Sequence, residues 1–315
     1  MASAMARLTP LELEEARRIG RSFGLEVRQV EALSGGSVNS NFRVETASAQ
    51  SVFLRVYEEQ VEAGARRELA LLATLARAGV PTPEPLSQRL EQHRGKPVAL
   101  FPWIEGEILC QARVRPEHTR AVGAALARVH LVKVDELAPS RFELGDLQAR
   151  LERARTPEYA EDVERIAERL VRYAQKRDPS LPSGVIHGDL FRDNVLWRGG
   201  QLAALIDFES ASLGVFAFDL MVCVQAWCFG DRFDLELVRS MLEGYHAVRR
   251  LEPRELAALG VEAALGALRF ATTRITDYSL RAPPGQPPLR DYRRFLARLA
   301  EIEAGVLEPV ALSLG

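Results

Sequence analysis

Three polar residues near the middle of the chain have the types and the spacing of a site that transfers a phosphoryl group. Asp189 precedes Asn194 in the run His-Gly-Asp-Leu-Phe-Arg-Asp-Asn, and Asp207 follows within Ile-Asp-Phe. A carboxylate beside a hydroxyl can orient it and accept its proton, whereas amide and carboxylate oxygens suit Mg²⁺. We therefore expect Asp189 to act as the base, and Asn194 and Asp207 to bind the metal.

A predicted β-hairpin brings the two metal ligands together. Two short apolar runs flank an Arg198-Gly199-Gly200-Gln201 turn, a pattern typical of paired strands. If Trp197 pairs with Leu202 across this turn, Asn194 and Asp207 lie at the same end of the hairpin. A single Asp or Asn usually caps a turn. Capping alone does not explain why Asp189, Asn194 and Asp207 occur together at this spacing.

The residues before this hairpin predict a small antiparallel sheet with helices. Thr9-Pro10 is typical of a helix start. Short β-rich runs at 27–33, 41–45 and 52–57 indicate a meander. A helix over residues 61–78 and a strand over residues 97–103 complete this part of the chain.

The residues after this sheet are mainly helical in pattern. Helices are predicted over 116–131, 157–175, 216–229, 235–248, 253–278 and 289–304. A chain of 315 residues suits two lobes sharing a cleft. The sequence thus predicts a bilobal α+β fold, with an N-lobe of residues 1–103 and a C-lobe of residues 104–315 that contains the catalytic hairpin 185–208.

Composition excludes several classes of protein. The net charge is −2 and the pI near 6.3, which argues against nucleic acid as the partner. No apolar run reaches the roughly 20 residues of a membrane span, and the first seven residues carry no visible secretory signal. Three cysteines cannot form a disulfide framework. We expect a cytoplasmic enzyme without a membrane partner.

The 185–208 hairpin resembles that of the aminoglycoside phosphotransferase and choline kinase superfamily, whose fold is protein-kinase-like. His-Gly-Asp stands here where protein kinases have His-Arg-Asp. Further segments are similar, in the same order, to homoserine kinases within that superfamily: Gly35 to Phe42, Ile206 to Phe208, Phe218 to Leu220, Gln225 to Phe229, and Leu268 to Phe270 with Thr273, Arg274 and Asp277. This resemblance implies phosphorylation of a small-molecule hydroxyl with ATP and Mg²⁺.

The resemblance also indicates where a nucleotide would bind. The loop Ser34, Gly35, Gly36 and Ser37 would fold over phosphates, because glycine allows close approach and exposed N–H groups bind anions; an ordinary hairpin turn is the alternative. Adenine would contact Phe101, Trp103 and Ile104, unless these residues only pack the strand. No lysine precedes Lys96, so Arg55 takes the place of the usual strand lysine, with Glu68 as its partner.

The acceptor site is expected in the helical lobe. Arg274 and Asp277 share one helix face, and Arg269 is a turn earlier. An amino acid needs a cation for its carboxylate and an anion for its ammonium, so this face could bind L-homoserine; an intrahelical ion pair is the alternative. Further wall candidates, each with a core or surface alternative, are Glu209, Phe216 and Trp227.

Two residues are expected to support the catalytic loop. His187 would brace the loop by hydrogen bonding. Asp219 would either cap its own helix or, as the resemblance implies, brace the same loop.

The motif residues predict a kinase, and the resemblance implies that its acceptor is L-homoserine, which it would convert to O-phospho-L-homoserine in threonine biosynthesis. Aminoglycoside, choline and other small-alcohol kinases are alternatives of the same class. A pseudokinase that binds nucleotide without turnover is the alternative of a different class, suggested only by Arg55.

Overall fold

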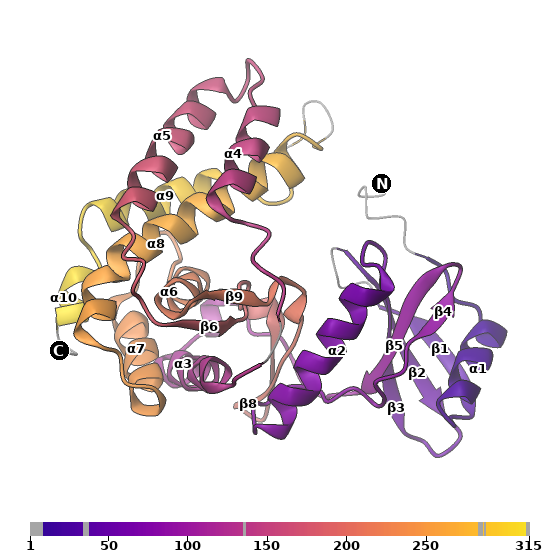
Figure 1. The fold of residues 1–315 in the computed structure, drawn as a ribbon. Coiled ribbons are helices and arrows are strands. Elements are labelled where there is room, and N and C mark those ends of the chain that lie inside the picture. The colour runs from indigo at the N-terminus through magenta and orange to yellow at the C-terminus, as the bar shows by residue number, and fades with distance from the viewer. Residues whose placement is uncertain (1–8, 34–37, 135–136, 283–285, 287, 313–315) are drawn as a thin grey trace. The chain divides into compact units, whose positions relative to one another are not determined.

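The protein folds into two compact units, shown as a ribbon in Figure 1. This computed structural model describes residues 9–33, 38–134, 137–282, 286 and 288–312. Unit 1 comprises Met1–Glu107, Leu196–Arg198 and Ala203–Glu209, and unit 2 comprises Ile108–Val195, Gly199–Leu202 and Ser210–Gly315. The residues of the 185–208 hairpin are therefore divided between the two units.

Unit 1 is built on a five-stranded antiparallel sheet with the strand order β1-β2-β3-β5-β4. Its elements are α1 (Leu13–Ser22), β1 (Val27–Ala32), β2 (Ser40–Thr46), β3 (Ser51–Val56), α2 (Glu62–Arg77), β4 (Glu91–His93) and β5 (Lys96–Pro102). The predicted meander and helix are confirmed. The short strand β4 was not predicted.

Alternation along β3 gives the sheet its two faces. Val52, Leu54 and Val56 are buried in a core with residues of α1 and the neighbouring strands. Phe53 and Arg55 alternate with them and so face the other side. This places an arginine on the face of the sheet opposite the α1 core.

The start of α1 differs from the prediction. Its N-cap is Glu12, whose capping box with Glu15 replaces the expected cap at Thr9. The backbone N–H of Thr9 instead donates to Ser40 Oγ and Glu58 Oε1, each at 2.9 Å. Thr9 therefore anchors the chain before the helix to the sheet, and Glu12 caps the helix in its place.

Unit 2 is mainly helical. Its helices are α3 (Pro116–Leu131), α4 (Leu144–Arg153), α5 (Ala160–Lys176), α6 (Phe216–Trp227), α7 (Leu235–Val248), α8 (Pro253–Arg274), a π-helical turn (Ile275–Ser279), α9 (Arg293–Glu303) and α10 (Glu308–Leu312). Two further strands, β6 (Ser183–Ile186) and β9 (Ser212–Val215), pair antiparallel. The six predicted helices are confirmed, whereas α4, α10 and β9 were not predicted.

The hairpin that links the candidate metal ligands is present. β7 (Val195–Arg198) pairs with β8 (Gln201–Leu205) in a two-stranded sheet. Gly199 and Gly200 have φ of 57° and 79°, the left-handed values that a type I′ turn requires. The predicted turn is therefore confirmed.

Helices α3 and α7 approach closely because each has a glycine at the contact. A Cβ on Gly123 would lie 2.2 Å from the Met241 carbonyl oxygen, and one on Gly244 would lie 2.1 Å from that of Arg120. No side chain fits at these distances. The pair matters for the site because α3 contributes His130 and α7 contributes Tyr245.

One helical stretch among the described residues, Pro253–Ser279, is long and apolar enough to cross a membrane by length and composition. Of its apolar window, 72% is buried inside the protein. This burial is typical of a core helix, so the stretch is weak evidence for a membrane span.

Candidate active site

The loop that carries Asp189 begins with a backbone turn that only glycine fits. Gly188 has φ +76°, and a Cβ there would lie 2.8 Å from the Ser210 carbonyl oxygen. Left-handed backbone and close packing both exclude larger residues. Gly188 thereby sets the direction in which the chain leaves β6 and presents Asp189.

The carboxylate of Asp219, on α6, holds this turn in place through hydrogen bonds to its backbone. Its carboxylate accepts N–H bonds from His187 at 2.7 Å and Gly188 at 2.8 Å, and contacts His130 Nε2 at 3.1 Å. Burial opposes its ionisation, but the hydrogen bonds from His130 and the loop backbone lower the pKa of Asp219 overall. Asp219 therefore braces the loop and does not cap α6, whose N-cap is Val215.

The brace extends to two residues for which the sequence carried no signal. His130 Nδ1 lies 2.6 Å from the Tyr245 hydroxyl. Burial lowers the pKa of His130, so a neutral ring that donates through Nε2 to Asp219 and accepts at Nδ1 from Tyr245 fits both contacts. His130 lies near the end of an apolar helix, and only the fold reveals that it faces Asp219.

The orientation of Asn194 suits a metal ligand. Its Nδ2 donates to the Asp189 carbonyl at 2.8 Å. Since the amide nitrogen is held in this way, the amide oxygen is the atom left to accept or to coordinate. His187 Nδ1 accepts the Asp189 N–H at 3.3 Å, and Trp227 Nε1 donates to the Leu190 carbonyl at 3.0 Å. The loop is thus fixed on both sides of Asp189.

Asp189 has a cationic neighbour on α8. Arg269 Nη1 lies 3.6 Å from Asp189 Oδ1. The Arg269 guanidinium is 4.0 Å from the Phe142 ring centroid and 3.8 Å from that of Phe270. Burial lowers the pKa of Arg269 to about 10, against the opposing effect of Asp189, so it remains a cation at neutral pH.

A separate cavity in unit 1 gathers the candidate nucleotide residues. It encloses about 210 Å³ and is lined by six of the predicted residues, Arg55, Glu68, Phe101, Trp103, Ile104 and Asp207, together with apolar side chains such as Phe53 and Leu72. An apolar cavity with a few polar groups is typical of a small-molecule site. The predicted loop residues Ser34, Gly35, Gly36 and Ser37 lie outside the described residues.

Arg55 is the centre of an acidic group in this cavity. Its Nη1 lies 3.3 Å from Glu68, 3.6 Å from Asp207 and 3.7 Å from Glu209. Burial opposes its charge, yet the three carboxylates raise the pKa of Arg55 overall. Burial raises the pKa of Glu68 to about 7, with Arg55 opposing the shift. One guanidinium therefore faces more carboxylate than it can neutralise.

This acidic excess fits a divalent cation bound through oxygen. Asp207 has φ +65°, rare for a residue with a side chain, and its buried Oδ1 accepts no hydrogen bond from the described residues. Such strained, unsatisfied groups concentrate at functional sites. Among the described residues no group of three His, Cys, Asp or Glu could hold a metal by itself, so phosphate and water oxygens would have to complete the shell.

Several acceptor candidates have other partners. Phe216 is buried and stacks on His130 at 4.6 Å between ring centroids, and Trp227 is fully buried. Asp277 pairs with Arg150 of α4 at 2.9 Å. Among the described residues Arg274 and Asp277 form no intrahelical ion pair, so that alternative is wrong. Glu209, expected in the acceptor wall, lies beside Arg55.

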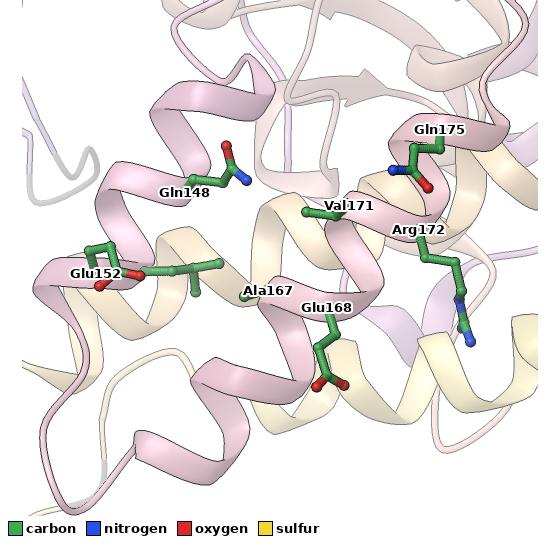
Figure 2. Close-up of a pocket in the computed structure, with 8 residues that line it drawn as sticks. Gln148, Glu152, Ala167, Glu168, Val171, Arg172 and Gln175 are labelled. Atoms are coloured by element: carbon green, nitrogen blue, oxygen red, sulfur yellow. The ribbon is translucent and has the colours of Figure 1, made fainter.

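The larger groove in unit 2 contains none of the predicted residues. It encloses about 520 Å³ between α4 and α5. Figure 2 shows Gln148 and Val171 directed toward each other across it, with Glu168 and Arg172 turned away. It is an open surface groove without convergent charged groups, and it has no link to the chemistry of Asp189.

Comparisons with known proteins show what this chain is similar to. Residues 29–251 match the phosphotransferase enzyme family. The homoserine kinase of Methylorubrum populi is 36% identical over 93% of this chain and 95% of its own length, and that of Allorhizobium ampelinum is 37% identical over 82% and 84%. An amicoumacin kinase solved in complex with AMP-PNP, Ca²⁺ and Ami has the same fold, with a TM-score of 0.69, 15% identity, and coverage of 94% of both chains.

Proposed function

Because the chain belongs to the phosphotransferase enzyme family, we propose that it transfers the γ-phosphate of ATP to the side-chain hydroxyl of L-homoserine. The observation that carries this proposal is 36% identity to a homoserine kinase along 93% of the chain. The product would be O-phospho-L-homoserine, an intermediate on the route to threonine. The reaction would take place in the cytoplasm.

Asp189 acts as the base in this proposal. It orients the acceptor hydroxyl and accepts its proton while the hydroxyl oxygen bonds to phosphorus and ADP leaves. The loop contacts support this role, because His187, Asp219 and Trp227 hold the backbone on either side. Because the folded protein already holds the base in place, no further entropy is lost in orienting it during the reaction. This positioning lowers the activation barrier.

The cavity of unit 1 binds the nucleotide. Its apolar walls, Phe53, Phe101 and Ile104 among them, suit a planar base. Arg55 lies at its polar end, next to Glu68, and an arginine can bind phosphate oxygens in a bidentate manner. The likeness in fold to a kinase that binds AMP-PNP supports a nucleotide in this class of fold.

Asn194 and Asp207 would hold Mg²⁺, which would supply positive charge against the phosphate oxygens. Asn194 directly precedes β7 and Asp207 follows β8, and these strands pair. The amide oxygen of Asn194 and the unsatisfied oxygen of Asp207 support the assignment. Glu209 lies 3.7 Å from Arg55, which also contacts Asp207 at 3.6 Å. We therefore assign Glu209 to the metal and nucleotide rather than to the acceptor.

The charges around Asp189 favour an anionic group on the acceptor. Arg269 lies at 3.6 Å, Asp189 and Arg290 both act electrostatically on Arg274, and Arg290 pairs with Asp193 at 3.3 Å. A polycationic aminoglycoside would be repelled by these arginines. For the cation of choline, the only carboxylates that these arginines contact in the described part of the chain are the base and Asp193, which is already paired with Arg290. The zwitterion of homoserine suits the site better.

The test is a steady-state assay of ADP release. Purified protein with ATP and Mg²⁺ is offered L-homoserine, L-serine, choline or kanamycin in turn, with Asp189→Asn as the control for the base. We expect turnover on homoserine that requires Mg²⁺ and falls by at least about 10³-fold in the variant. Equal turnover on all four acceptors would overturn the acceptor assignment, and full activity of Asp189→Asn would remove the base.

A further inference from the structure

A group of arginines beside the catalytic loop has no carboxylate partner in the part of the chain that the structure describes. Among those residues, none of Arg192, Arg274, Arg294 and Arg298 takes part in an ion pair. Arg298 is only 6% exposed. A buried guanidinium without a counter-charge is costly and is usually paired or used to bind an anion.

Two of these arginines have a structural explanation. Arg298 Nε donates to the Gln225 carbonyl at 3.0 Å, and Arg192 donates to the Ala226 carbonyl. These carbonyls end α6, and cations at a helix C-terminus are favoured by its unpaired carbonyls and dipole. Arg192 and Arg298 are therefore compensated in part by the helix.

Arg274 has less compensation. Its Nη1 donates to the Asp291 carbonyl at 3.2 Å, and its guanidinium rests 4.4 Å from the Phe295 ring centroid. A guanidinium has five N–H donors, so this contact leaves several of them for a ligand. Burial, followed by repulsion from Arg290 and Arg294, lowers the pKa of Arg274 to about 10, which leaves it charged at neutral pH.

Aromatic contacts connect Arg274 to the catalytic loop. Phe191, two residues after Asp189, packs edge-on against Phe270 at 4.9 Å between centroids. Phe270 in turn stacks on Phe295 at 5.0 Å, the ring that supports Arg274. The arginine is thus connected to the loop through the rings of Phe270 and Phe295, and Asp189 contributes to its electrostatic surroundings.

The backbone after Arg274 removes its natural partner. In a regular helix Asp277, at i+3, would lie beside Arg274. Here α8 gives way to a π-helical turn over Ile275–Ser279, and Asp277 pairs with Arg150 and Thr276 instead. Single π turns are rare and are frequent at functional sites.

We propose that Arg274 binds the carboxylate of the acceptor amino acid, and that the π-helical turn keeps this arginine available for it. This proposal rests on the proposed function, and it names the residue that would make the enzyme prefer an acceptor with a carboxylate. The two-carbon spacer of homoserine separates the reactive hydroxyl, at Asp189, from the carbon that carries the carboxylate. An acceptor without a carboxylate loses this contact but keeps the hydroxyl.

The experiment compares L-homoserine with L-homoserinamide, which has nearly the same shape without the negative charge. For the wild type we expect kcat/KM about 10- to 100-fold higher on homoserine, the range of one charge-assisted pair. Arg274→Gln should lose about that factor on homoserine and keep its value on the amide and its KM for ATP. Arg274→Lys should recover part of the loss. Arg293→Gln, at an exposed arginine that begins α9 and pairs with Asp291, is the matched control and should behave as wild type.

Each outcome bears on the proposal. A wild type that does not distinguish acid from amide overturns it, even if the Arg274 variants fail to fold. An equal loss on both acceptors in Arg274→Gln also overturns it, because that pattern reports damage to the fold. Absence of any turnover on homoserine in the wild type, with turnover on another alcohol, would instead refute the proposed function.

Discussion

Arg269 Nη1 lies 3.6 Å from Asp189 Oδ1, and the arginine is held there by Phe142 and Phe270 on its faces. The ion pair favours the charged form of Arg269. Rings on both sides leave the guanidinium little freedom to turn away. Arg269 thus acts on the reaction through Asp189, as a positioning residue that keeps the carboxylate in place.

Replacement of Arg269 by Gln should lower kcat for homoserine. The guanidinium lies 3.6 Å from Asp189 Oδ1, so without it the carboxylate is held less firmly where it must meet the acceptor hydroxyl. The measurement is kcat and KM for homoserine and for ATP, with Arg269→Lys as a variant that keeps the charge and should recover part of the loss. An unchanged kcat in Arg269→Gln would show that the pair has no influence on Asp189.

Removal of Arg55 should affect both nucleotide binding and stability. Arg55→Ala leaves the buried carboxylate of Glu68 without its cation, and loss of one partner of a buried pair costs about 3–5 kcal/mol. We expect a higher KM for ATP and a lower Tm, both restored in part by Arg55→Lys. Arg66→Ala is the control, because Arg66 pairs with Glu62 on the surface of α2. An unchanged KM for ATP in Arg55→Ala would contradict its assignment to the nucleotide.

Glu58 should make the stability of unit 1 depend on pH. It accepts hydrogen bonds from Thr9 and Ser40 and pairs with Lys96. Burial opposes ionisation, but these partners lower the pKa of Glu58 to about 2. An acid with a lowered folded-state pKa stabilises the protein above its unfolded pKa, near 4.5, and loses this contribution as pH falls toward 2.

The corresponding variant is Glu58→Gln, examined by urea unfolding at about pH 7 and pH 3. We expect a loss of about 1–3 kcal/mol at neutral pH and a smaller difference from wild type at the acidic pH. Glu45→Gln, at an exposed position of β2, should have little effect at either pH. A loss of equal size at both pH values would mean that the charge of Glu58 does not stabilise the fold.

Alanine substitutions should have opposite effects at two helical glycines. Gly123→Ala forces α3 away from the Met241 carbonyl, and overpacking of this kind costs about 1–3 kcal/mol. Gly260 is exposed within α8, and a methyl group placed there would meet no atom within 4 Å, so Gly260→Ala should stabilise by up to about 1 kcal/mol. Thermal unfolding measures both. A Gly123→Ala protein as stable as wild type would contradict the close packing of α3 and α7.

Local patterns in the sequence were sufficient for much of the fold. The helices at 116–131 and 235–248 have the predicted bounds because their apolar spacing is regular and their starts carry Pro116 and Asp234. Helix α4 was missed because only Leu147 and Leu151 of its ten residues are buried. Strands β4 and β9 are too short to form a pattern.

The site was harder to predict wherever a contact joins distant parts of the chain. The motif containing Asp189, Asn194 and Asp207 is local and could be identified directly. In contrast, Asp277 pairs with an arginine 127 residues away, and His130 meets Asp219 across 89 residues. Helical spacing placed Asp277 beside Arg274, but the π-helical turn changes that geometry, and no residue pattern indicated the turn.

The most direct test of the account is a competition for limiting ATP. Wild-type protein with Mg²⁺ receives an equimolar mixture of L-homoserine, L-serine, choline and kanamycin, and ³¹P NMR with mass spectrometry identifies the phosphorylated products. Their ratio equals the ratio of kcat/KM values, which is the measure of specificity. The account predicts O-phospho-L-homoserine as the dominant product, formed at least about 10³-fold more slowly with Asp189→Asn. A dominant phosphorylated choline or kanamycin would contradict the account.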